Sequence, residues 1–384
     1  MFKKVLYWAP CLNKVGTYYS TINSAIALQK YSQSNFKPVI INVCGEWNDS
    51  EILFKENNIE VIKFCKKNYF KFLPKDGFLK SRLSYIFIIL LSIMPLVRLL
   101  IKNKDNLLII HLLTSLPLIL KYVFNLKIKM ILRISGYPRL NYFRKKLWKY
   151  ANQKLEFITC PTIDLSNQIK EFEIFDKQKI IFLPDAIINI KTKIKDLRLN
   201  KKSYDSKTIL AVGRFTKQKN FLYLIKEFQK FLKKKDNYKL IILGDGENKI
   251  KIEKFIKEKN ISNNVLLKGH VENVYNYMKN SDLFVLSSLW EDPGFVIIEA
   301  AFCNLFVVAS NCPNGPIEFL ENGKNGILFE SNKEDALLNS LIKFDNLEKS
   351  DLMQKKINLK KNTKKYSIFR HYLVLSKIIK QVNF

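Results

Sequence analysis

Short apolar runs, each followed by a helical segment, are the feature that most constrains how this chain can fold. Val5–Ala9, Val39–Val43 and Leu107–Ile110 are uncharged runs with the length of a buried strand, too short for a helix. The pattern restarts at Thr208–Val212, after a charged, glycine-free stretch at 191–207. Strands that alternate with helices in this way are typical of parallel sheets covered by helices.

The restart predicts an α/β protein of two Rossmann-like parallel-sheet domains, 1–195 and 196–384, facing each other across a cleft. The stretch 191–207 is the expected linker, and the C-terminal helix is a candidate to cross back to the first domain. Glycine usage supports this division, because four of the 12 glycines precede residue 200 and eight lie between Gly213 and Gly326.

The net charge of +31 would ordinarily indicate nucleic acid or an anionic membrane as a partner. Only eight of the 65 basic residues are arginine, and arginine is the stronger marker of phosphate and base recognition. The sequence also lacks a recognisable nucleic-acid-binding module. We therefore expect attraction to an anionic membrane surface and no nucleic acid partner.

Cysteine and histidine usage indicates a reducing compartment without a zinc site. The six cysteines form no C-x-x-C pair, and the chain has three histidines. This pattern predicts free, buried thiols and argues against zinc. The segment Met1–Trp8 is too short and aromatic for a signal peptide and is typical of a first strand, so we expect a cytoplasmic location.

One uncharged stretch, Ser84–Val97, stands out in the first domain, with Arg82 and Arg98 on either side. Fourteen residues fall short of the roughly 20 that span a bilayer, which argues against a transmembrane helix. Two alternatives remain open. The stretch is either a buried helix or a helix lying in the membrane interface with basic flanks that bind lipid phosphates.

The segment 287–300 predicts a ligand site at a strand-to-helix junction. It follows a buried strand at Leu283–Leu286, and Pro293 and Gly294 mark the turn into an apolar helix. The first amides of that helix favour an anionic or hydroxyl-rich partner. Glu291 and Glu299 lie before and after the turn, so both carboxylates could accept hydrogen bonds from the hydroxyls of one sugar.

A second junction carries positive charge. The strand Thr208–Val212 leads into Gly213, followed by Arg214 and Lys219 just before a helix. Two cations and a helix N-terminus offer the charge that a nucleoside diphosphate needs, especially as a leaving group without metal. Arginine binds phosphate oxygens through forked hydrogen bonds, and lysine provides a point charge.

In the first half, four residues are candidate site residues. Gly16 lies at the turn after the first strand, where backbone amides could meet a phosphate or sugar. His111 follows the strand Leu107–Ile110, and ligands of parallel sheets bind outside the carboxyl ends of strands. Arg133 and Ser135, at the end of a later strand, are weaker acceptor-side candidates, for which ordinary loop chemistry is the alternative.

Glu291-x7-Glu299 with its internal Gly294-Phe295 resembles the signature of the retaining glycosyltransferases of family 4. The string Gly213–Asn220 resembles that family's diphosphate motif, and Thr114-Ser115-Leu116-Pro117 resembles the pattern after its active-site histidine. The chain departs from the family at Val15-Gly16, where a Gly-Gly pair is usual. The resemblance implies the GT-B fold, with a sugar nucleotide in the second domain and the acceptor in the first.

The resemblance also assigns roles to residues. Arg214 and Lys219 would neutralise the departing diphosphate, and Glu299 would bind the ribose hydroxyls. Glu291 and the backbone of Gly294, Phe295 and Val296 would hold the donor sugar, and His111 would orient it. The remaining expected donor contacts are Gly16, Gly244 and the backbone of His270 and Val271.

The reaction implied by the family is transfer of a hexose or N-acetylhexosamine with retention of configuration. UDP is the expected nucleotide, and no metal cofactor is expected, because the chain contains no Asp-x-Asp. The basic composition and the stretch Ser84–Val97 suit a lipid-linked saccharide acceptor at the cytoplasmic face of the inner membrane, in surface polysaccharide or O-antigen assembly. The alternatives are a sugar-nucleotide epimerase of the same fold and a basic, non-catalytic membrane- or nucleic-acid-binding protein.

Overall fold

The chain folds into two compact units, each built on one parallel sheet. The computed structural model describes residues 3–33, 35–75, 78–189 and 206–382. The first unit comprises Met1–Ile187 and Ile368–Phe384, and the second comprises Ile188–Ser367. The predicted boundary at 195 and the predicted linker up to residue 205 lie outside the described residues. The final helix belongs to the first unit, in agreement with the expectation that the C-terminal helix crosses back, so the second unit ends before the predicted boundary at residue 384.

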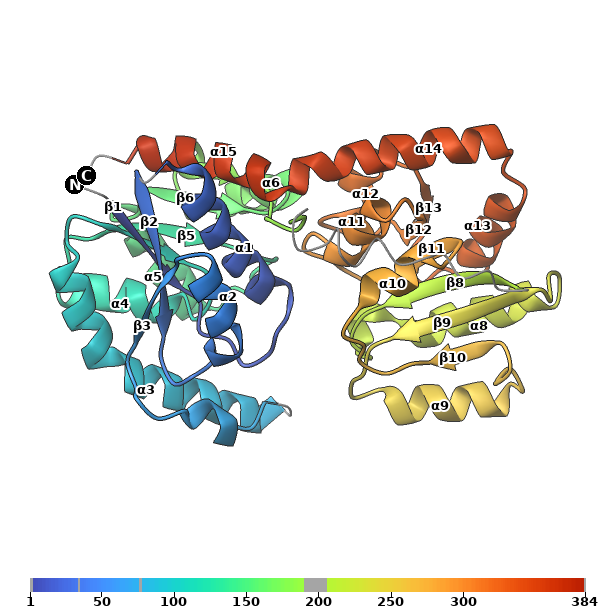
Figure 1. The fold of residues 1–384 in the computed structure, drawn as a ribbon, viewed down its shortest axis with the longest axis horizontal. Coiled ribbons are helices and arrows are strands. Elements are labelled where there is room, and N and C mark those ends of the chain that lie inside the picture. Colours follow the sequence, from blue (N-terminus) through green and yellow to red (C-terminus); the bar gives the residue numbers. More distant parts are fainter. Residues whose placement is uncertain (1–2, 34, 76–77, 190–205, 383–384) are drawn as a thin grey trace. The chain divides into compact units, whose positions relative to one another are not determined.

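The first unit contains a seven-stranded sheet in the order β3-β2-β1-β4-β5-β6-β7, with all neighbouring strands parallel (Figure 1). The strands are β1 (Lys3–Trp8), β2 (Phe36–Asn42), β3 (Glu60–Lys63), β4 (Leu107–Ile110), β5 (Lys129–Arg133), β6 (Phe157–Cys160) and β7 (Ile180–Phe182). The chain reverses its direction of travel across the sheet between β1 and β4. Ligands of such sheets bind at this switch point.

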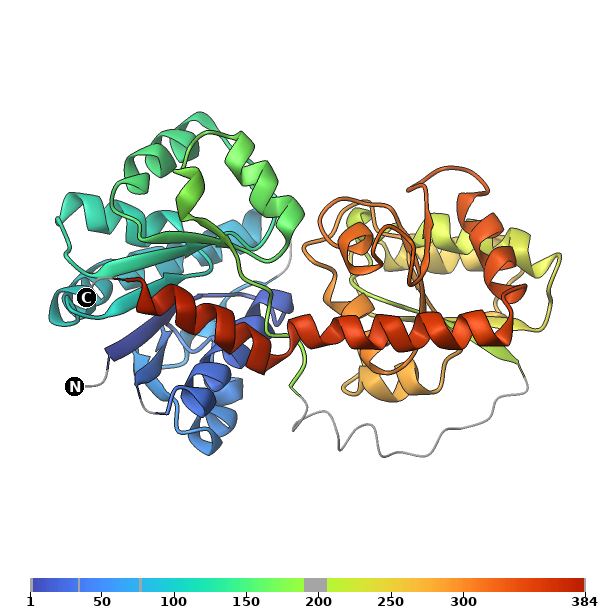
Figure 2. The same cartoon turned by 90° about the horizontal axis from the view of Figure 1, so that it is seen from above.

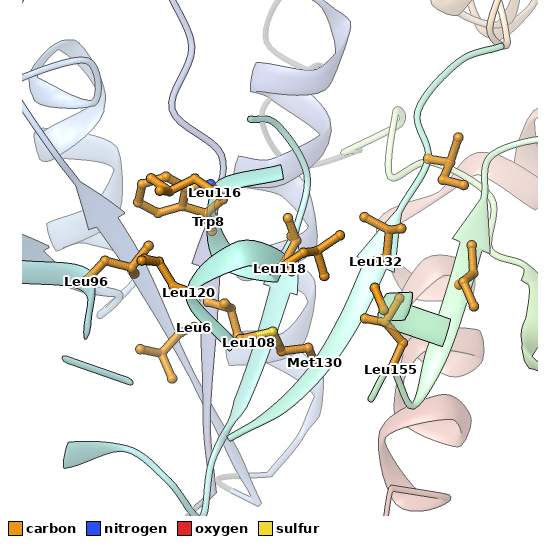
Figure 3. Packing of buried hydrophobic residues seen from close by; sticks show 14 of the residues in the cluster. Leu6, Trp8, Leu96, Leu108, Leu116, Leu118, Leu120, Met130, Leu132 and Leu155 are labelled. Carbon is orange, nitrogen blue, oxygen red and sulfur yellow. The ribbon is translucent and has the colours of Figure 1, made fainter. Parts of the chain in front are cut away.

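Two hydrophobic cores cover the two faces of this sheet, because successive strand residues point to opposite sides. Leu6 and Trp8 of β1 belong to one core, with α3 (Phe78–Lys102), α4 (Ser115–Val123), α5 (Tyr142–Asn152) and α6 (Ile163–Glu171) (Figure 3). Val5 and Tyr7 belong to the other, with α1 (Gly16–Tyr31), α2 (Glu51–Glu56) and α15 (Ile368–Lys380). Figures 1 and 2 show α15 (red) alongside α1, against which it packs.

The second unit contains a six-stranded parallel sheet in the order β10-β9-β8-β11-β12-β13. Its strands are β8 (Lys207–Val212), β9 (Tyr238–Leu243), β10 (Val265–Leu267), β11 (Leu283–Leu286), β12 (Phe306–Ser310) and β13 (Ile327–Phe329). Its helices are α8 (Phe221–Leu232), α9 (Lys249–Glu258), α10 (Val274–Lys279), α11 (Phe295–Phe302), α12 (Pro316–Phe319), α13 (Ala336–Asp345) and α14 (Lys349–Asn362). The two sheets confirm the predicted fold class.

Helix α3 is longer than the uncharged stretch that marked it in the sequence, because the residues around Arg82 and Arg98 are helical too. Judged by length and composition alone, the segment Leu79–Lys102 is long and apolar enough to span a membrane. Of its most apolar 18 residues, 33% are buried. Ile88 and Leu96 pack into the core, whereas other apolar side chains of α3 are exposed. The helix therefore combines a core face with an exposed apolar face.

A buried histidine fastens α15 to the first unit. His371 Nδ1 donates to Pro184 O at 2.7 Å, so Nε2 accepts from Ser24 Oγ, also at 2.7 Å. The Ser24 hydroxyl is in turn 3.0 Å from Tyr7 OH. Burial, followed by the positive charge of Arg133, lowers the pKa of His371 from 6.5 to about 4. The imidazole is therefore neutral in the folded protein at pH 7.

Because the folded-state pKa of His371 lies below its unfolded-state value, the unfolded chain binds the proton more tightly. The stabilisation is complete above pH 6.5 and is lost as the pH falls toward 4. We expect the free energy of unfolding of the wild type to fall between pH 7 and pH 5 by about 2 kcal/mol more than that of His371→Asn. Urea denaturation of both proteins at the two pH values measures this difference. Equal losses would contradict the assignment.

Candidate functional site

The site of the second unit is built from two loops that leave neighbouring strands. β8 lies between β9 and β11, and the chain passes first to β9 and only later to β11, which makes the carboxyl ends of β8 and β11 a switch point. The two loops are joined directly. Ser287 Oγ donates to Lys219 O and Leu289 N donates to Gln218 O, both at 2.8 Å, and Gln218 Nε2 donates to Trp290 O at 2.8 Å.

A buried ion pair lies at the centre of this junction. Lys219 Nζ and Ser288 Oγ both donate to Glu291 Oε1, each at 2.5 Å. The side chains of Lys219 and Glu291 are 13% and 7% exposed, so both charges are largely removed from water. Ser310 Oγ fixes the arrangement from a third strand by donating to Ser288 O at 2.6 Å. The predicted cation and the predicted carboxylate are thus brought together.

Gly294 directs the chain from Glu291 into α11. Its φ of 83° lies in the left-handed region, which glycine adopts without the cost that a side chain incurs. Gly294 is the N-cap of α11 and provides no side-chain cap, so the first amides of the helix are available to a ligand. Phe295 and Val296 form the first helical positions and are half-buried. The amides of Phe295 and Val296 therefore follow the buried carboxylate of Glu291 closely in the chain.

The second carboxylate of the signature lies further along α11. Glu299 Oε1 accepts a hydrogen bond from Tyr275 OH of α10 at 2.5 Å, and Glu299 is half-buried. Tyr275 itself is 9% exposed. The phenol therefore fixes the orientation of one carboxylate oxygen of the glutamate.

Close backbone packing brings the loops after β8, β9 and β10 together. A Cβ atom on Gly244 would lie 1.9 Å from Gly213 O, which no side chain tolerates. Gly244 N donates to Gly269 O at 2.7 Å, so the chain just before His270 and Val271 joins the same edge. His270 is exposed. Arg214, next to Gly213, is also exposed, so its guanidinium is open to solvent at this edge.

In the first unit, His111 and Gly16 both lie at the switch point. Gly16 begins α1 after β1, and His111 follows β4, where its backbone N donates to Trp8 O at 2.8 Å. The imidazole is 5% exposed, its Nδ1 is 3.4 Å from Thr21 Oγ1, and its Nε2 has no hydrogen-bond partner within the described residues. Burial, then the charge of Arg133, holds the pKa of His111 well below its usual range. The ring is therefore neutral near pH 7.

Arg133 is buried in the first unit, which argues against its predicted acceptor-side role. It is 2% exposed, its NH2 is 2.6 Å from Asp185 Oδ1, and its NH1 donates to Leu183 O at 3.0 Å. Ser20 Oγ also donates to the Asp185 carboxylate, at 2.5 Å. The position of Arg133 at the end of a strand suggested an accessible side chain. Its charge is instead compensated inside the unit by Asp185, which lies in a loop far along the chain. Ser135 is half-buried, and its role stays a prediction.

Three residues that support the site were not predicted. Ser288 and Tyr275 bind the two glutamates, and Gly315 lets the turn after β12 approach the loop at Pro293. A Cβ atom on Gly315 would lie 2.1 Å from Pro293 O. The Gly-Pro pair at 315–316 was a detectable turn signal, whereas the two hydroxyl contacts depend on tertiary packing. The described residues contain no group of three His, Cys, Asp or Glu side chains placed to hold a metal ion.

The second unit matches a known enzyme family in sequence. Residues 192–366 match the family Glycosyl transferases group 1. An enzyme of Campylobacter jejuni, N-acetylgalactosamine-N,N'-diacetylbacillosaminyl-diphospho-undecaprenol 4-alpha-N-acetylgalactosaminyltransferase, is 28% identical over 242 residues, 59% of this chain and 64% of that protein. An Escherichia coli UDP-Gal:alpha-D-GlcNAc-diphosphoundecaprenol alpha-1,3-galactosyltransferase is 31% identical over 231 residues, 55% of this chain and 58% of that protein. The chain thus spans less than two thirds of these relatives.

Solved structures, one of them named as a glycosyltransferase, match the fold of nearly the whole chain. A glycosyltransferase of Rickettsia africae superposes with a TM-score of 0.75 at 18% identity, covering 99% of this chain and 100% of that one. An Anabaena protein in complex with UDP and glucose superposes with a TM-score of 0.73 at 14% identity, covering 99% and 100%. At such identities the likeness concerns the fold, and it is that of GT-B glycosyltransferases.

The buried pair predicts strong coupling between Lys219 and Glu291. Removing one partner leaves an uncompensated charge in a dry site, so Lys219→Met and Glu291→Gln are each expected to lower the free energy of unfolding by about 3 kcal/mol. The double variant should be more stable than the sum of these losses implies, by at least about 1 kcal/mol. Urea denaturation of the four proteins measures the coupling.

The exposed pair of Lys254 and Glu258, with side chains 77% and 54% exposed, provides the control. Its corresponding cycle should show a coupling below about 0.5 kcal/mol. Additive losses at Lys219 and Glu291 would show that the two charges do not depend on each other.

Proposed function

We propose that the protein is a retaining glycosyltransferase that moves a hexose or N-acetylhexosamine from a nucleotide sugar, with UDP as the expected nucleotide, to a lipid-linked saccharide. The observation that carries the proposal is the cluster of Lys219, Glu291 and Ser288 at the switch point of the unit that matches Glycosyl transferases group 1. Cation, carboxylate and helix N-terminus are the groups that bind a diphosphate and a sugar together.

The donor is bound by groups with complementary chemistry. The exposed Arg214 guanidinium forms forked hydrogen bonds with diphosphate oxygens. Lys219 uses one donor on Glu291 and keeps others for phosphate, since an ammonium has three. Glu291 holds the hydroxyls of the transferred sugar, with the amides of Gly294, Phe295 and Val296 beside it. Glu299, oriented by Tyr275, accepts from the ribose hydroxyls.

The reaction breaks the bond between the anomeric carbon and the diphosphate oxygen and forms a bond to the acceptor oxygen. We assign both events to the same face of the sugar, through one ion-pair-like transition state, which retains the anomeric configuration. The acceptor proton passes to the departing phosphate oxygen. Arg214 and Lys219 stabilise the negative charge that develops there, so no metal is assigned. The neutral His111 imidazole is the hydrogen-bonding group contributed by the first unit.

Two observations support a lipid-linked acceptor and a peripheral location on the cytoplasmic face of the inner membrane. Both the Campylobacter and the Escherichia coli relatives carry diphospho-undecaprenol sugars in their names, which supports a role in surface polysaccharide or O-antigen assembly. On α3, the exposed apolar residues Leu79, Leu83, Ile86, Leu90 and Met94 recur every three or four residues. They therefore form one apolar face, and basic residues flank it, as in interfacial helices.

Replacing the exposed arginine tests the diphosphate assignment. Arg214→Ala is expected to lower kcat/KM for sugar transfer by about 100-fold or more, because a charge-stabilising donor to the leaving group is lost. Lys217→Ala is the matched control, since Lys217 is an exposed cation of the same loop and should change kcat/KM less than about threefold. A panel of sugar nucleotides with lipid-linked acceptors provides the assay. Wild-type turnover by Arg214→Ala would remove the assignment.

Metal independence is a separate expectation. Because two side-chain cations are assigned to the leaving group, transfer should continue at an unchanged rate in excess EDTA. The measurement is initial rate with and without chelator, followed by addition of manganese or magnesium. If EDTA abolishes transfer and manganese or magnesium restores it, the metal-free mechanism is wrong. The donor-binding role of Arg214 is tested separately, by the Arg214→Ala variant.

A further inference from the structure

A pocket of 260 Å³ lies in the first unit between α4 and α5, and none of the residues assigned to sugar transfer lines it. Leu118 of α4, Leu147 of α5 and Leu155 are among its lining residues. Leu118 and Leu155 belong to the core beneath and are drawn in Figure 3. The inner part of the pocket is therefore apolar and backed by well-packed side chains.

Three lysines surround this apolar pocket. The lining residues, all within the described part of the chain, include Lys121, Lys146 and Lys154 and no acidic residue. Glu156 lies near enough to attract Lys121, but its carboxylate is 3.1 Å from Lys129 Nζ. Positive charge is thus concentrated at the pocket without an acidic lining residue to balance it.

Lys121 differs from an ordinary surface lysine. It is 7% exposed, and its ammonium donates to the carbonyl oxygens of Leu126 and Ile128, which uses two of three donors. Burial first, then the charges of Lys129 and Lys154, lowers its pKa to about 8. A lysine that only covered apolar surface would extend its ammonium into water. Here one donor of Lys121 remains, and Lys146 and Lys154 line the same pocket. An anion in the pocket would stabilise this arrangement of charges.

The rim of the pocket has the composition of a membrane interface. Tyr122 and Tyr150 line it, with ring centroids 6.2 Å apart, and they are 61% and 57% exposed. Phe124 beside them is also exposed. Tyrosine rings favour the boundary between head groups and acyl chains. α4 also packs against α3, which carries the exposed apolar face described above.

We propose that the pocket between α4 and α5 binds the phosphate of an anionic membrane lipid at Lys121, Lys146 and Lys154, with an acyl chain against Leu118 and Leu147. Cations bind the phosphate, and the apolar lining removes methylene groups from water, so the ligand needs both parts. The site concerns membrane attachment through a specific lipid. It goes beyond sugar transfer and does not depend on the donor assignments.

Three soluble probes separate the two parts of the ligand. Dihexanoyl phosphatidylglycerol below its micelle concentration carries the anionic head group and short chains, dihexanoyl phosphatidylcholine carries the same chains without net charge, and glycerol 3-phosphate carries the charge alone. Isothermal titration should detect saturable binding of the first probe, with affinity at least about 10-fold above the other two. Equal binding of phosphatidylglycerol and phosphatidylcholine would overturn the role of the lysines. Equal binding of glycerol 3-phosphate would identify a site for free phosphate esters and overturn the lipid.

A matched pair of variants locates the binding. Lys146→Gln/Lys154→Gln removes two charges from the pocket, whereas Lys145→Gln/Lys149→Gln removes two exposed charges of α5 that do not line it. The pocket variant should weaken phosphatidylglycerol binding by roughly 10-fold or more and the control by less than about twofold. Lys145, Lys146 and Lys149 are exposed and Lys154 is half-buried, so both variants should fold. The midpoint of thermal unfolding of each variant verifies this.

Vesicles provide the final comparison. The pocket variant should bind vesicles of phosphatidylcholine with 30% phosphatidylglycerol more weakly than the control variant, while Leu83→Asn/Leu90→Asn, on the exposed face of α3, should keep wild-type affinity for the soluble lipid. Equal vesicle and soluble-lipid binding by the two lysine variants would mean that only overall charge matters, and the proposed pocket would be rejected.

Discussion

The buried pair of Lys219 and Glu291 is the interaction on which the site of the second unit depends. Two charges that are largely out of water stabilise each other only when their geometry is fixed, and here hydroxyls from Ser288 and Ser310 fix it through three neighbouring strands. The loops after β8 and β11 are therefore held as one structure. The predicted signature residues Lys219 and Glu291 are therefore held in place by contacts that also connect the ends of the sheet strands.

Both units place their candidate residues at the point where the chain changes direction across the sheet, but they do so with opposite electrostatics. The second unit gathers charge, with Arg214 exposed and Lys219 paired. The first unit holds a neutral His111, kept neutral by burial and by the nearby charge of Arg133. A charged site in one unit and a neutral one in the other are compatible with the same topology, because the side chains at the strand ends differ.

Local sequence predicted most strands of both sheets and the loops that carry the candidate residues, since strand length, glycine turns and helix starts are short-range signals. It did not predict the short edge strand β13. It could not predict which strand-end side chains are accessible. Arg133 was a candidate for the acceptor side, but Asp185, 52 residues away in the chain, compensates its charge inside the first unit. Ser288 and Tyr275 were missed for the same reason, because their roles depend on hydrogen bonds to glutamates that only the tertiary structure brings near. The length of α3 was underestimated because charged residues at its ends were excluded from the apolar stretch.

The return of α15 to the first unit has a consequence for synthesis. Because Ile368–Phe384 packs with Met1–Ile187, the second unit is an insertion within the first, and the ribosome completes it before the polypeptide that closes the earlier unit emerges. Val5, Tyr7 and Ile22 share a core with Leu375 and Ile379. During translation this apolar surface stays uncovered until α15 has been made, so the nascent chain exposes it to aggregation for as long as the second unit is being synthesised.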